Sequence, residues 1–486
     1  MVAVGVADVR PIVDRVCARP DVLDACRERN LGYVIKALWE NGLSQGKMGA
    51  LTGKPQGRIS EWMTGKRAPQ HASVIDEIAT GLGFPPAARR ALGLTAEPGI
   101  TAHPSSSQQL DADLAFPGTA VELSDTLTRL WRADIQDPAE SQRRSLDPRA
   151  WNDASLNWLV APPHIPAAES LGRVQVGLSD VQRFRITVGM FDQLDDRFGG
   201  GNARQALIQY LATDAERLLR GKFTDAVGRE LRSAVAQATL LAAWMTYDSN
   251  PSSGLAQRYF VQALALAKAA DDKPLGGSIL DAMSHQATYM GRFTEAANLA
   301  RAARTGTGTT ATATLTAHFH TMEARALARL GDAKGCDRAL AEAVRAFERR
   351  DPGNDPEWIR YFNDIELNAE FGHCYRDLGR AAAAAKYATE GILAPDGTSY
   401  ARSDFFVAIV LADSYLGSGD VEQACATVRK ALDVGEQLRS ARCVGYLRDF
   451  SKRLSRAGDT TAVVQLNSAV SQSRLWRIAT RSAAAN

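Results

Sequence analysis

Few side chains in this sequence have the types and spacing that covalent catalysis requires. Cys374 directly follows His373, and a cysteine and a histidine can act together as nucleophile and base. Neighbouring residues on a helix point in different directions, however, so we expect Cys374 to lie in the core. The run GGGN at 199–202 lacks the Lys-Ser or Lys-Thr pair of a phosphate-binding loop, and we expect a turn there. With no GxSxG or HExxH motif, the sequence predicts no catalytic residue, no cofactor and no enzyme.

The spacing of the cysteines and histidines and the overall charge argue against several other classes of protein. The six cysteines form no CxxC pair and the histidines lack paired spacing, so we expect neither a metal site nor a disulfide scaffold. Of the 486 residues 45% are hydrophobic, as in an ordinary globular protein. The net charge is +2, so the overall electrostatic field does not favour binding to nucleic acid or to a membrane. Because we find neither a signal peptide nor a long apolar run, we expect a cytoplasmic protein with no membrane partner.

Composition divides the chain into four regions. Residues 10–94 read as short helices, and 95–117 are rich in Pro, Ser and Gln, which predicts a flexible linker. Residues 118–220 predict a helical connecting region, in which 151–163 carries two tryptophans and is expected to dock on the rest. Residues 221–480 are rich in Ala and Leu with helical spacing. Strand patterns of period two are missing, so the sequence predicts an all-α fold: an N-terminal helix-turn-helix bundle followed by an α-solenoid.

A repeating pattern of turn residues supports the solenoid. The turn anchors are spaced 40, 40, 48 and 40 residues apart: Pro251, Gly291, Gly331, Gly379 and Gly419. Five residues after each anchor lies a small residue that would let two helices approach closely: Ala256, Ala296, Cys336, Ala384 and Ala424. The pattern resembles the tetratricopeptide repeat, for example in GHCYRDLGRAAAAA at 372–385, and a weaker copy around Gly458 would be a terminal cap. The alternative is an irregular Ala-rich helical bundle.

The segment QGKMGALTGKPQGRISEWMT at 45–64 has the spacing of two short helices joined by a tight turn. Gly53 can take the positive φ of the turn, and Gly49 lets the two helices cross closely. Ser44 is a natural N-cap for the first helix, and Pro55 suits the first turn of the second helix. Ile59 and Trp62 would anchor the second helix in the core.

Residues 43–84 resemble the Xre/Cro-type regulator domain, a DNA-binding helix-turn-helix. The resemblance rests on the Ser-Gln opening, the glycine turn, the Ile-Ser pair in the second helix, the Gly-Lys-Arg-x-Pro exit and the closing Ile-Ala-x-x-Leu-Gly. The family usually has alanine where this chain has Gly49, and Gly57 weakens the second helix. Residues 43–72 carry five basic side chains and one acidic one, a local charge of +4 that suits DNA.

This resemblance implies that the helix 55–64 lies in the major groove of double-stranded DNA. Gln56 would read adenine through two hydrogen bonds, Arg58 would contact guanine or a phosphate, and Gln45 would hold a phosphate and support Gln56. The full set of implied DNA-binding residues is Gln45, Lys54, Gln56, Gly57, Arg58, Ser60, Thr64, Lys66 and Arg67. The alternative is a basic surface that binds something else.

The repeat resemblance implies a superhelix whose first helices line a concave groove. The groove-facing positions carry both charge signs and three histidines: Asp281, His285, His318, Arg325, Glu366, His373, Arg376 and Asp413. Such a groove suits a short peptide or a polar small molecule, with Arg325 as a carboxylate clamp and Asp281 or Asp413 holding an amine. The alternative is a hydrated groove with ordinary ion pairs.

The order of the two regions resembles actinobacterial transcriptional regulators that join an Xre-type head to a tetratricopeptide sensor. The resemblance implies a homodimer on a palindromic operator, in which a peptide or small-molecule ligand sets the spacing of the two heads. Two rival interpretations remain open. The chain could be an interaction scaffold, or an antitoxin-like protein that acts through a protein partner.

Overall fold

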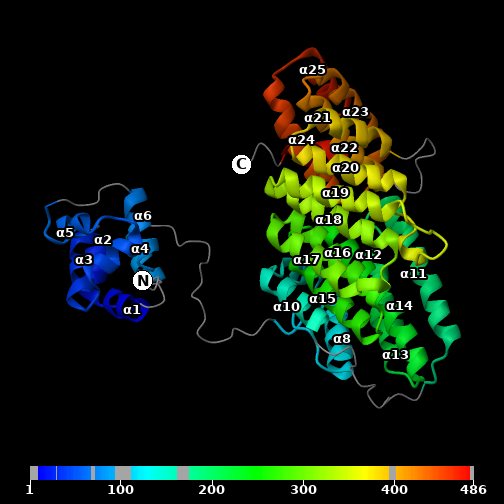
Figure 1. Ribbon diagram of the computed structural model, residues 1–486, viewed down its shortest axis with the longest axis horizontal. Coiled ribbons are helices and arrows are strands. Elements are labelled where there is room, and N and C mark those ends of the chain that lie inside the picture. The colour runs from blue at the N-terminus through cyan, green and yellow to red at the C-terminus, as the bar shows by residue number, and fades with distance from the viewer. Residues whose placement is uncertain are drawn as a thin grey trace. The chain divides into compact units, whose positions relative to one another are not determined.

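The computed structural model describes residues 9–28, 30–66, 72–92, 111–160, 174–392 and 401–481. Within these ranges the chain is helical and has no β-strand; a backbone bridge joins Gln175 and Lys222. The predicted all-α fold is therefore confirmed. The chain divides into two compact units, Met1–Gln109 and Leu110–Asn486 (Figure 1).

The N-terminal unit is a bundle of short helices: α1 (Arg10–Cys17), α2 (Pro20–Arg27), α3 (Leu31–Glu40), α4 (Gln45–Thr52), α5 (Gln56–Met63), α6 (Ala72–Gly81) and α7 (Pro86–Ala91). Asn30 caps α3 by accepting a hydrogen bond from the backbone N–H of Tyr33. α3 buries Val34, Ile35 and Leu38 in the core of the bundle and packs against α5, while α4 packs against both α5 and α6.

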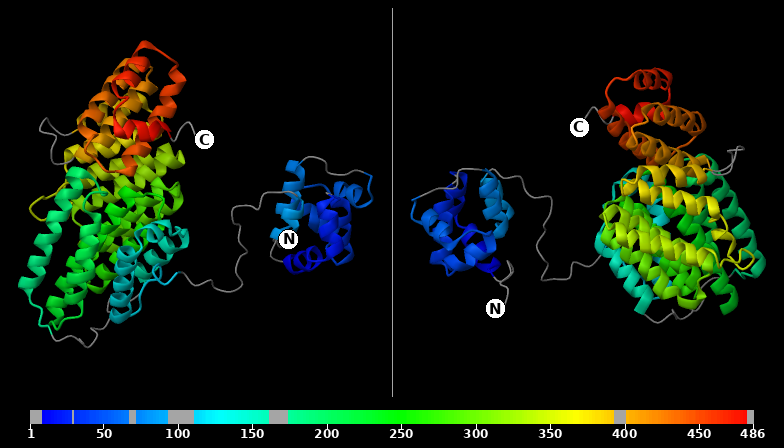
Figure 2. Two further views of the ribbon diagram at one scale, coloured as in Figure 1. Left: turned by 180° about the vertical axis from the view of Figure 1, so that it is seen from behind. Right: turned by 45° about the horizontal axis from the view of Figure 1, so that its top comes forward.

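The C-terminal unit contains a stack of five helix hairpins. These are α14 (Asp225–Ser249) with α15 (Gly254–Ala269), α16 (Lys273–Tyr289) with α17 (Phe293–Thr307), α18 (Ala313–Leu330) with α19 (Ala333–Phe347), α20 (Asp364–Asp377) with α21 (Ala381–Glu390), and α22 (Ala401–Gly417) with α23 (Val421–Gly435). The helices α24 (Ala441–Leu454), α25 (Thr461–Ala469) and α26 (Arg474–Arg481) follow. Figure 2 shows the stack in chain order, from green at the first hairpin to red at the last helices.

The glycine anchors predicted from the sequence lie in the turns of these hairpins. Their φ angles are 75°, 78°, 70° and 84°, in the left-handed region that favours glycine: Gly291, Gly331, Gly379 and Gly419. The small residues five positions later are all fully buried: Ala256, Ala296, Cys336, Ala384 and Ala424. The predicted repeat register therefore corresponds to the observed hairpins.

Residues 118–220 belong to the same unit as the hairpins. They form α8 (Ala120–Gln136), α9 (Pro138–Arg143), α10 (Pro148–Val160), α11 (Leu178–Phe198), α12 (Arg204–Tyr210), a π-helical turn (Leu211–Ala215) and α13 (Glu216–Leu219). α8, α9 and α10 pack against α15, and α10 also packs against α17.

The tryptophans of α10 dock on the hairpins, as the sequence predicts. Trp151 is fully buried, and the ring of Trp158 is so close to α16 and α17 that a Cβ on Gly276 or Gly306 would overlap it. This confirms the docking for 151–160, whereas residues 161–163 lie outside the described part of the chain.

The prediction of a flexible linker over residues 95–117 is wrong for its C-terminal end. Residues 111–117 pack on the hairpins, because Arg258 of α15 pairs with Asp111 at 2.6 Å and Gln262 donates to the backbone carbonyl of Asp113 at 2.9 Å. Asp113 also pairs with Arg144 at 2.5 Å. The part of the predicted linker before residue 111 lies outside the described residues.

Candidate functional site

The turn between α4 and α5 has the geometry of a helix-turn-helix. α4 ends at Gly53, whose φ of 66° is in the left-handed region as predicted. Ser44 caps α4 by accepting a hydrogen bond from the backbone N–H of Lys47. Pro55 immediately precedes α5, where its missing N–H costs the helix no hydrogen bond.

Gly49 brings α4 and the start of α5 into close contact. A Cβ on Gly49 would lie 2.7 Å from the carbonyl oxygen of Lys54, well inside van der Waals contact. A Cβ on Gly81 of α6 would lie 2.5 Å from the carbonyl oxygen of Leu51 on the other side of α4. Both glycines are therefore needed for the helices to approach, and alanine at position 49 would push the turn outward.

α5 has one buried face and one accessible face. Ile59 and Trp62 are 0% and 5% exposed, so they anchor the helix in the core as predicted. The residues expected to contact DNA on the other side are exposed or half-buried: Gln56, Gly57, Arg58, Ser60, Thr64 and Lys66. The first turn of α5 is therefore accessible to a large partner.

The contacts of two predicted DNA-binding residues, Gln45 and Lys54, differ from the expectation. Gln45 does not support Gln56; its amide donates to the sulfur of Met63 at 3.5 Å, because the side chain lies along the far end of α5. Lys54 pairs with Glu77 of α6 at 2.6 Å. Glu77 lies outside the helix-turn-helix segment 45–64, and the sequence did not predict that it would pair with Lys54.

Arg58, a further predicted residue, lies on the accessible side of α5. Arg58 lies 3.4 Å from Glu61, one turn later on α5, in an exposed ion pair of the kind that contributes little to stability. Its guanidinium can therefore exchange Glu61 for a phosphate at small cost. Arg67 lies outside the described residues.

The C-terminal unit contains a cavity of about 1700 Å³ on the inner side of the hairpins, open to solvent along part of α11. Its wall is formed by the first helices of the hairpins, by residues 356–363 and by α11. α11 lies against both α14 and α22, and α14 also contacts α24, so the first hairpin meets the last elements of the array. The array therefore closes around the cavity.

Six of the eight predicted groove residues line this cavity: Asp281, His285, His318, Arg325, Glu366 and His373. Arg376 and Asp413 do not. Asp413 pairs with Arg453 of α24 at 2.5 Å and lies 3.7 Å from Arg376, which also pairs with Asp377 at 2.8 Å. These ion pairs between side chains join α20, α22 and α24, so Asp413 is not available to bind a ligand amine.

The predicted carboxylate clamp is also occupied. Arg325 is buried and lies 3.2 Å from both carboxylate oxygens of Glu370, and its guanidinium approaches the hydroxyl of Tyr446 at 3.4 Å. Because its strongest contacts are made within the protein, Arg325 contributes to the wall of the cavity and is a poor clamp for a ligand carboxylate.

The acidic residues of α11 were missed by the sequence analysis. Asp192, Asp195 and Asp196 lie one turn apart on a single face of the helix and line the cavity. Arg402 of α22 faces them, at 2.9 Å from Asp195 and 3.9 Å from Asp196. The i, i+3, i+4 spacing in FDQLDDRF could have indicated one acidic face, but not its direction.

These carboxyl groups resist ionisation. Burial in the fold and the nearby charge of Asp195 raise the pKa of Asp192 to about 6, although the charge of Arg402 partly offsets them. Burial and the charge of Asp192 raise the pKa of Asp196 to about 7. Glu366 of α20, which accepts a hydrogen bond from Ser403 at 3.0 Å, has its pKa raised by burial to about 7. Near pH 7 these carboxyl groups are therefore partly protonated, and a cation in the cavity would favour their ionised forms.

The three histidines of the cavity differ in the direction in which their pKa values are shifted. Burial and the charge of Arg325 lower the pKa values of His285 and His373 well below their ordinary value, so both are neutral near pH 7. His318 is different: burial opposes its charge, but Asp281, 2.6 Å from its Nδ1, outweighs burial and raises its pKa. Tyr361 lies 3.2 Å from the other ring nitrogen of His318.

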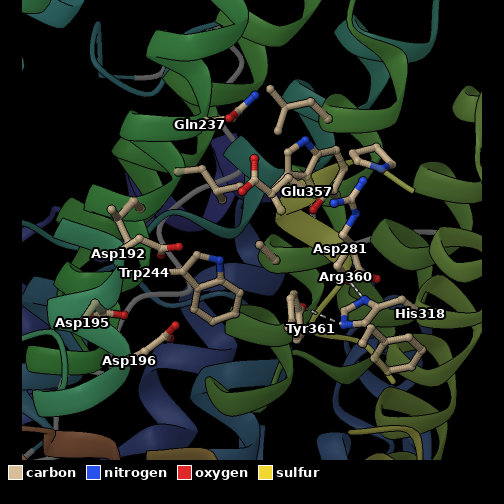
Figure 3. Close-up of a pocket in the computed structure, with 18 of the residues that line it drawn as sticks. Asp192, Asp195, Asp196, Gln237, Trp244, Asp281, His318, Glu357, Arg360 and Tyr361 are labelled. Atoms are coloured by element: carbon tan, nitrogen blue, oxygen red, sulfur yellow. Dashed lines mark hydrogen bonds and ion pairs between the residues drawn. The ribbon is translucent and has the colours of Figure 1, made fainter. Parts of the chain in front are cut away.

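Figure 3 shows how these groups lie. Asp192, Asp195 and Asp196 are on one side of the view, and His318, Tyr361 and Asp281 are on the other. The indole of Trp244 lies between the two sets. In this view an aromatic side chain therefore separates the acidic face of α11 from the Asp281–His318 pair.

Comparison of the chain with protein-family models, curated proteins and solved structures found no match. Among the described residues, no group of three or more His, Cys, Asp and Glu side chains is arranged to hold a metal ion. Nor does any helix in the described ranges have the length and apolar character needed to cross a membrane.

Proposed function

We propose that this protein is a sequence-specific DNA-binding transcriptional regulator, with a ligand-sensing helical array. The observation that carries the proposal is the arrangement of α5. Its core anchors Ile59 and Trp62 fix the helix, while Gln56 on its first turn is exposed. A recognition helix needs this combination, because its N-terminal side chains must reach base edges while the rest of the helix stays rigid.

Two glycines that the fold does not require also support DNA binding. A Cβ on Gly46 in the first turn of α4, or on Gly57 in the first turn of α5, would have no atom within 4 Å. Glycine in a helix costs roughly 0.5–1 kcal/mol relative to alanine, and here no packing offsets that cost. The bare backbone at both helix starts would instead allow phosphates to approach the N–H groups closely.

The cavity supports the sensing part of the proposal. It is larger than the roughly 300–1,000 Å³ of ordinary small-molecule sites, and its wall combines residues from the first and last elements of the array. A ligand that contacts both α11 and the inner helices would favour one curvature of the array. In a homodimer, a change of curvature would alter the distance between the two DNA-binding units.

A selection from random double-stranded DNA with the purified full-length protein tests the proposal. We expect a palindromic site whose half-sites lie about one helical turn, roughly 34 Å, apart. Binding should weaken with salt at a slope of about 0.9 per phosphate contact. Failure to retain any DNA at low salt would contradict the proposal and favour an interaction scaffold. Retention only with an added protein partner would favour the antitoxin-like interpretation.

A further inference from the structure

The charges on the cavity wall are unbalanced. Nine Asp and Glu side chains line the cavity, against five Arg side chains and no Lys. The arginines are also already in contact with acceptors of the protein: Arg325 with Glu370, Arg402 with Asp195, and Arg442 with Asp248 behind the wall. The excess of acidic side chains over arginines is therefore available to a cationic ligand.

Two buried carboxylates on the wall have an oxygen without a partner. Asp281 is 3% exposed and gives one oxygen to His318, whereas its Oδ1 has no hydrogen bond. Asp195 is 2% exposed, and its Oδ1 also lacks a hydrogen bond. An unsatisfied buried acceptor costs free energy, so both carboxylates retain unused capacity to accept a hydrogen bond beside the cavity.

The remaining acidic groups point to the same kind of ligand. Asp192 makes no ion pair shorter than 4 Å within the described residues, and Asp196 has only the 3.9 Å approach of Arg402. Burial, and after it the repulsion between these carboxylates, raises both pKa values, and a cation bound beside them would stabilise their ionised forms.

The aromatic and apolar residues suit an extended cation. In the view of Figure 3, Trp244 lies between the acidic face of α11 and the Asp281–His318 pair. An indole attracts ammonium and guanidinium groups, and the guanidinium of Arg442 already lies 5.7 Å from the centroid of this ring. Ile186 and Met190 of α11 also line the cavity and are 58% and 60% exposed, so they offer apolar contact to a hydrocarbon stem.

We propose that the cavity binds an elongated organic polycation, in which at least two ammonium or guanidinium groups are joined by a hydrocarbon or peptide stem. One cationic group would lie against Asp192 and Asp196 and another against Asp281, with Trp244 between them. Polyamines and short peptides rich in Lys or Arg share this chemistry. The inference rests on the ligand-sensing part of the proposed function and does not depend on DNA binding.

Calorimetric titration of the purified full-length protein, without DNA and at physiological salt, tests this inference. The probes are spermine, a blocked hexapeptide of alternating Lys and Ala, and a matched peptide with Glu in place of Lys. We expect at least one polycation to bind and the Glu peptide not to bind. The tighter of the two polycations identifies the source. If neither binds, or if the Glu peptide binds as well, the inference is wrong.

A double variant locates the binding. Asp192→Asn with Asp196→Asn should weaken polycation binding at least tenfold. The matched control is Asp433→Asn with Glu348→Gln, which removes two charges from exposed positions, one on α23 and one directly after α19, and should leave binding unchanged. Equal affinities of the two double variants would overturn the assignment. A failed DNA selection together with polycation binding would reject only the DNA-binding part of the proposed function.

Discussion

Asp248, in the last turn of α14, forms a buried ion pair with Arg442 of α24, in which Nε and Oδ1 are 2.7 Å apart. The two residues are 194 positions apart in the sequence. Asp248 also accepts hydrogen bonds from the hydroxyl of Ser440 and the backbone N–H of Gly200. Burial opposes its ionisation, but Arg442 and Arg402 outweigh burial and lower its pKa. This single carboxylate therefore joins the first hairpin, the α11–α12 turn and the end of the array.

We predict that Asp248→Asn destabilises the C-terminal unit by about 3–5 kcal/mol, because it leaves the buried Arg442 without its counter-charge. Urea unfolding followed by circular dichroism measures the change. The control is Asp337→Asn, which breaks the pair between Asp337 and Arg380 on two neighbouring hairpins. Both partners of that pair are more than a third exposed, so its loss should cost less than about 1 kcal/mol. Similar losses from both variants would refute the joining role of Asp248.

Substitution of two glycines by alanine should have opposite effects on the N-terminal unit. Gly57→Ala should stabilise it by about 0.5–1 kcal/mol, because the new Cβ meets no other atom. Gly49→Ala should destabilise it, because its Cβ would lie 2.7 Å from a backbone oxygen. Hydrogen exchange of amides in residues 30–66 of the full chain reports both changes. If the missing side chain of Gly57 lets a DNA phosphate approach the backbone of α5, Gly57→Ala should weaken DNA binding despite the gain in stability. Unchanged DNA affinity would contradict this role of Gly57.

Gln56→Ala should cost about 1–3 kcal/mol at one base position of the selected site and relax sequence preference there. The measurement compares affinities of wild type and variant for the selected site and for a scrambled duplex. Only the selected site should lose affinity, because a base contact carries sequence information and a phosphate contact does not. An equal loss on both duplexes would mean that Gln56 does not read a base.

Glu77→Gln should strengthen DNA binding, because it releases Lys54 from its 2.6 Å ion pair. The salt dependence of binding should then become steeper by about one phosphate contact, a slope change of roughly 0.9. Glu40→Gln is the matched control, since it removes the same charge from the same unit at the longer Lys36–Glu40 pair of α3. An identical gain from both variants would indicate an effect of net charge alone.

The raised pKa of Asp196 predicts a stability change that depends on pH. Its pKa rises from an ordinary value of 3.8 to about 7, because of burial and the charges of Asp192, Asp195 and Glu366, which Arg402 only partly offsets. Between these pH values the folded chain keeps a proton that the unfolded chain has lost, so this group's contribution to stability falls as pH rises.

Asp196→Asn should therefore stabilise the protein at pH 8 and have little effect at pH 5. The gain should be about 1 kcal/mol, because a third of the side chain is exposed and solvent screens the repulsion. Thermal unfolding of wild type and variant at the two pH values measures the difference. A gain that is the same at both pH values would show that the carboxyl is not held protonated by its neighbours. Glu366, whose pKa responds to Glu370, His318 and Asp404, should add to the same trend in the wild type.

The local elements could be predicted because short-range pattern determines them. Gly53 was expected in the left-handed turn, and Ile59 and Trp62 in the core, from their spacing within twenty residues. The glycine anchors and the buried small residues of the hairpins follow from the same kind of repeat. Each of these features depends on which face of one helix its neighbour covers, and periodicity contains that information.

Tertiary structure alone decided what the cavity offers to a ligand. Arg325 and Asp413 are on the inner helices as the register indicates, but Glu370 and Arg453 already hold them. The acidic face of α11 lies outside the repeats, and it reaches the cavity only because α11 packs across α14 and α22. Contacts between residues so far apart depend on how the stacked hairpins curve and close. That curvature is the sum of many small packing angles, which no local pattern in the sequence specifies.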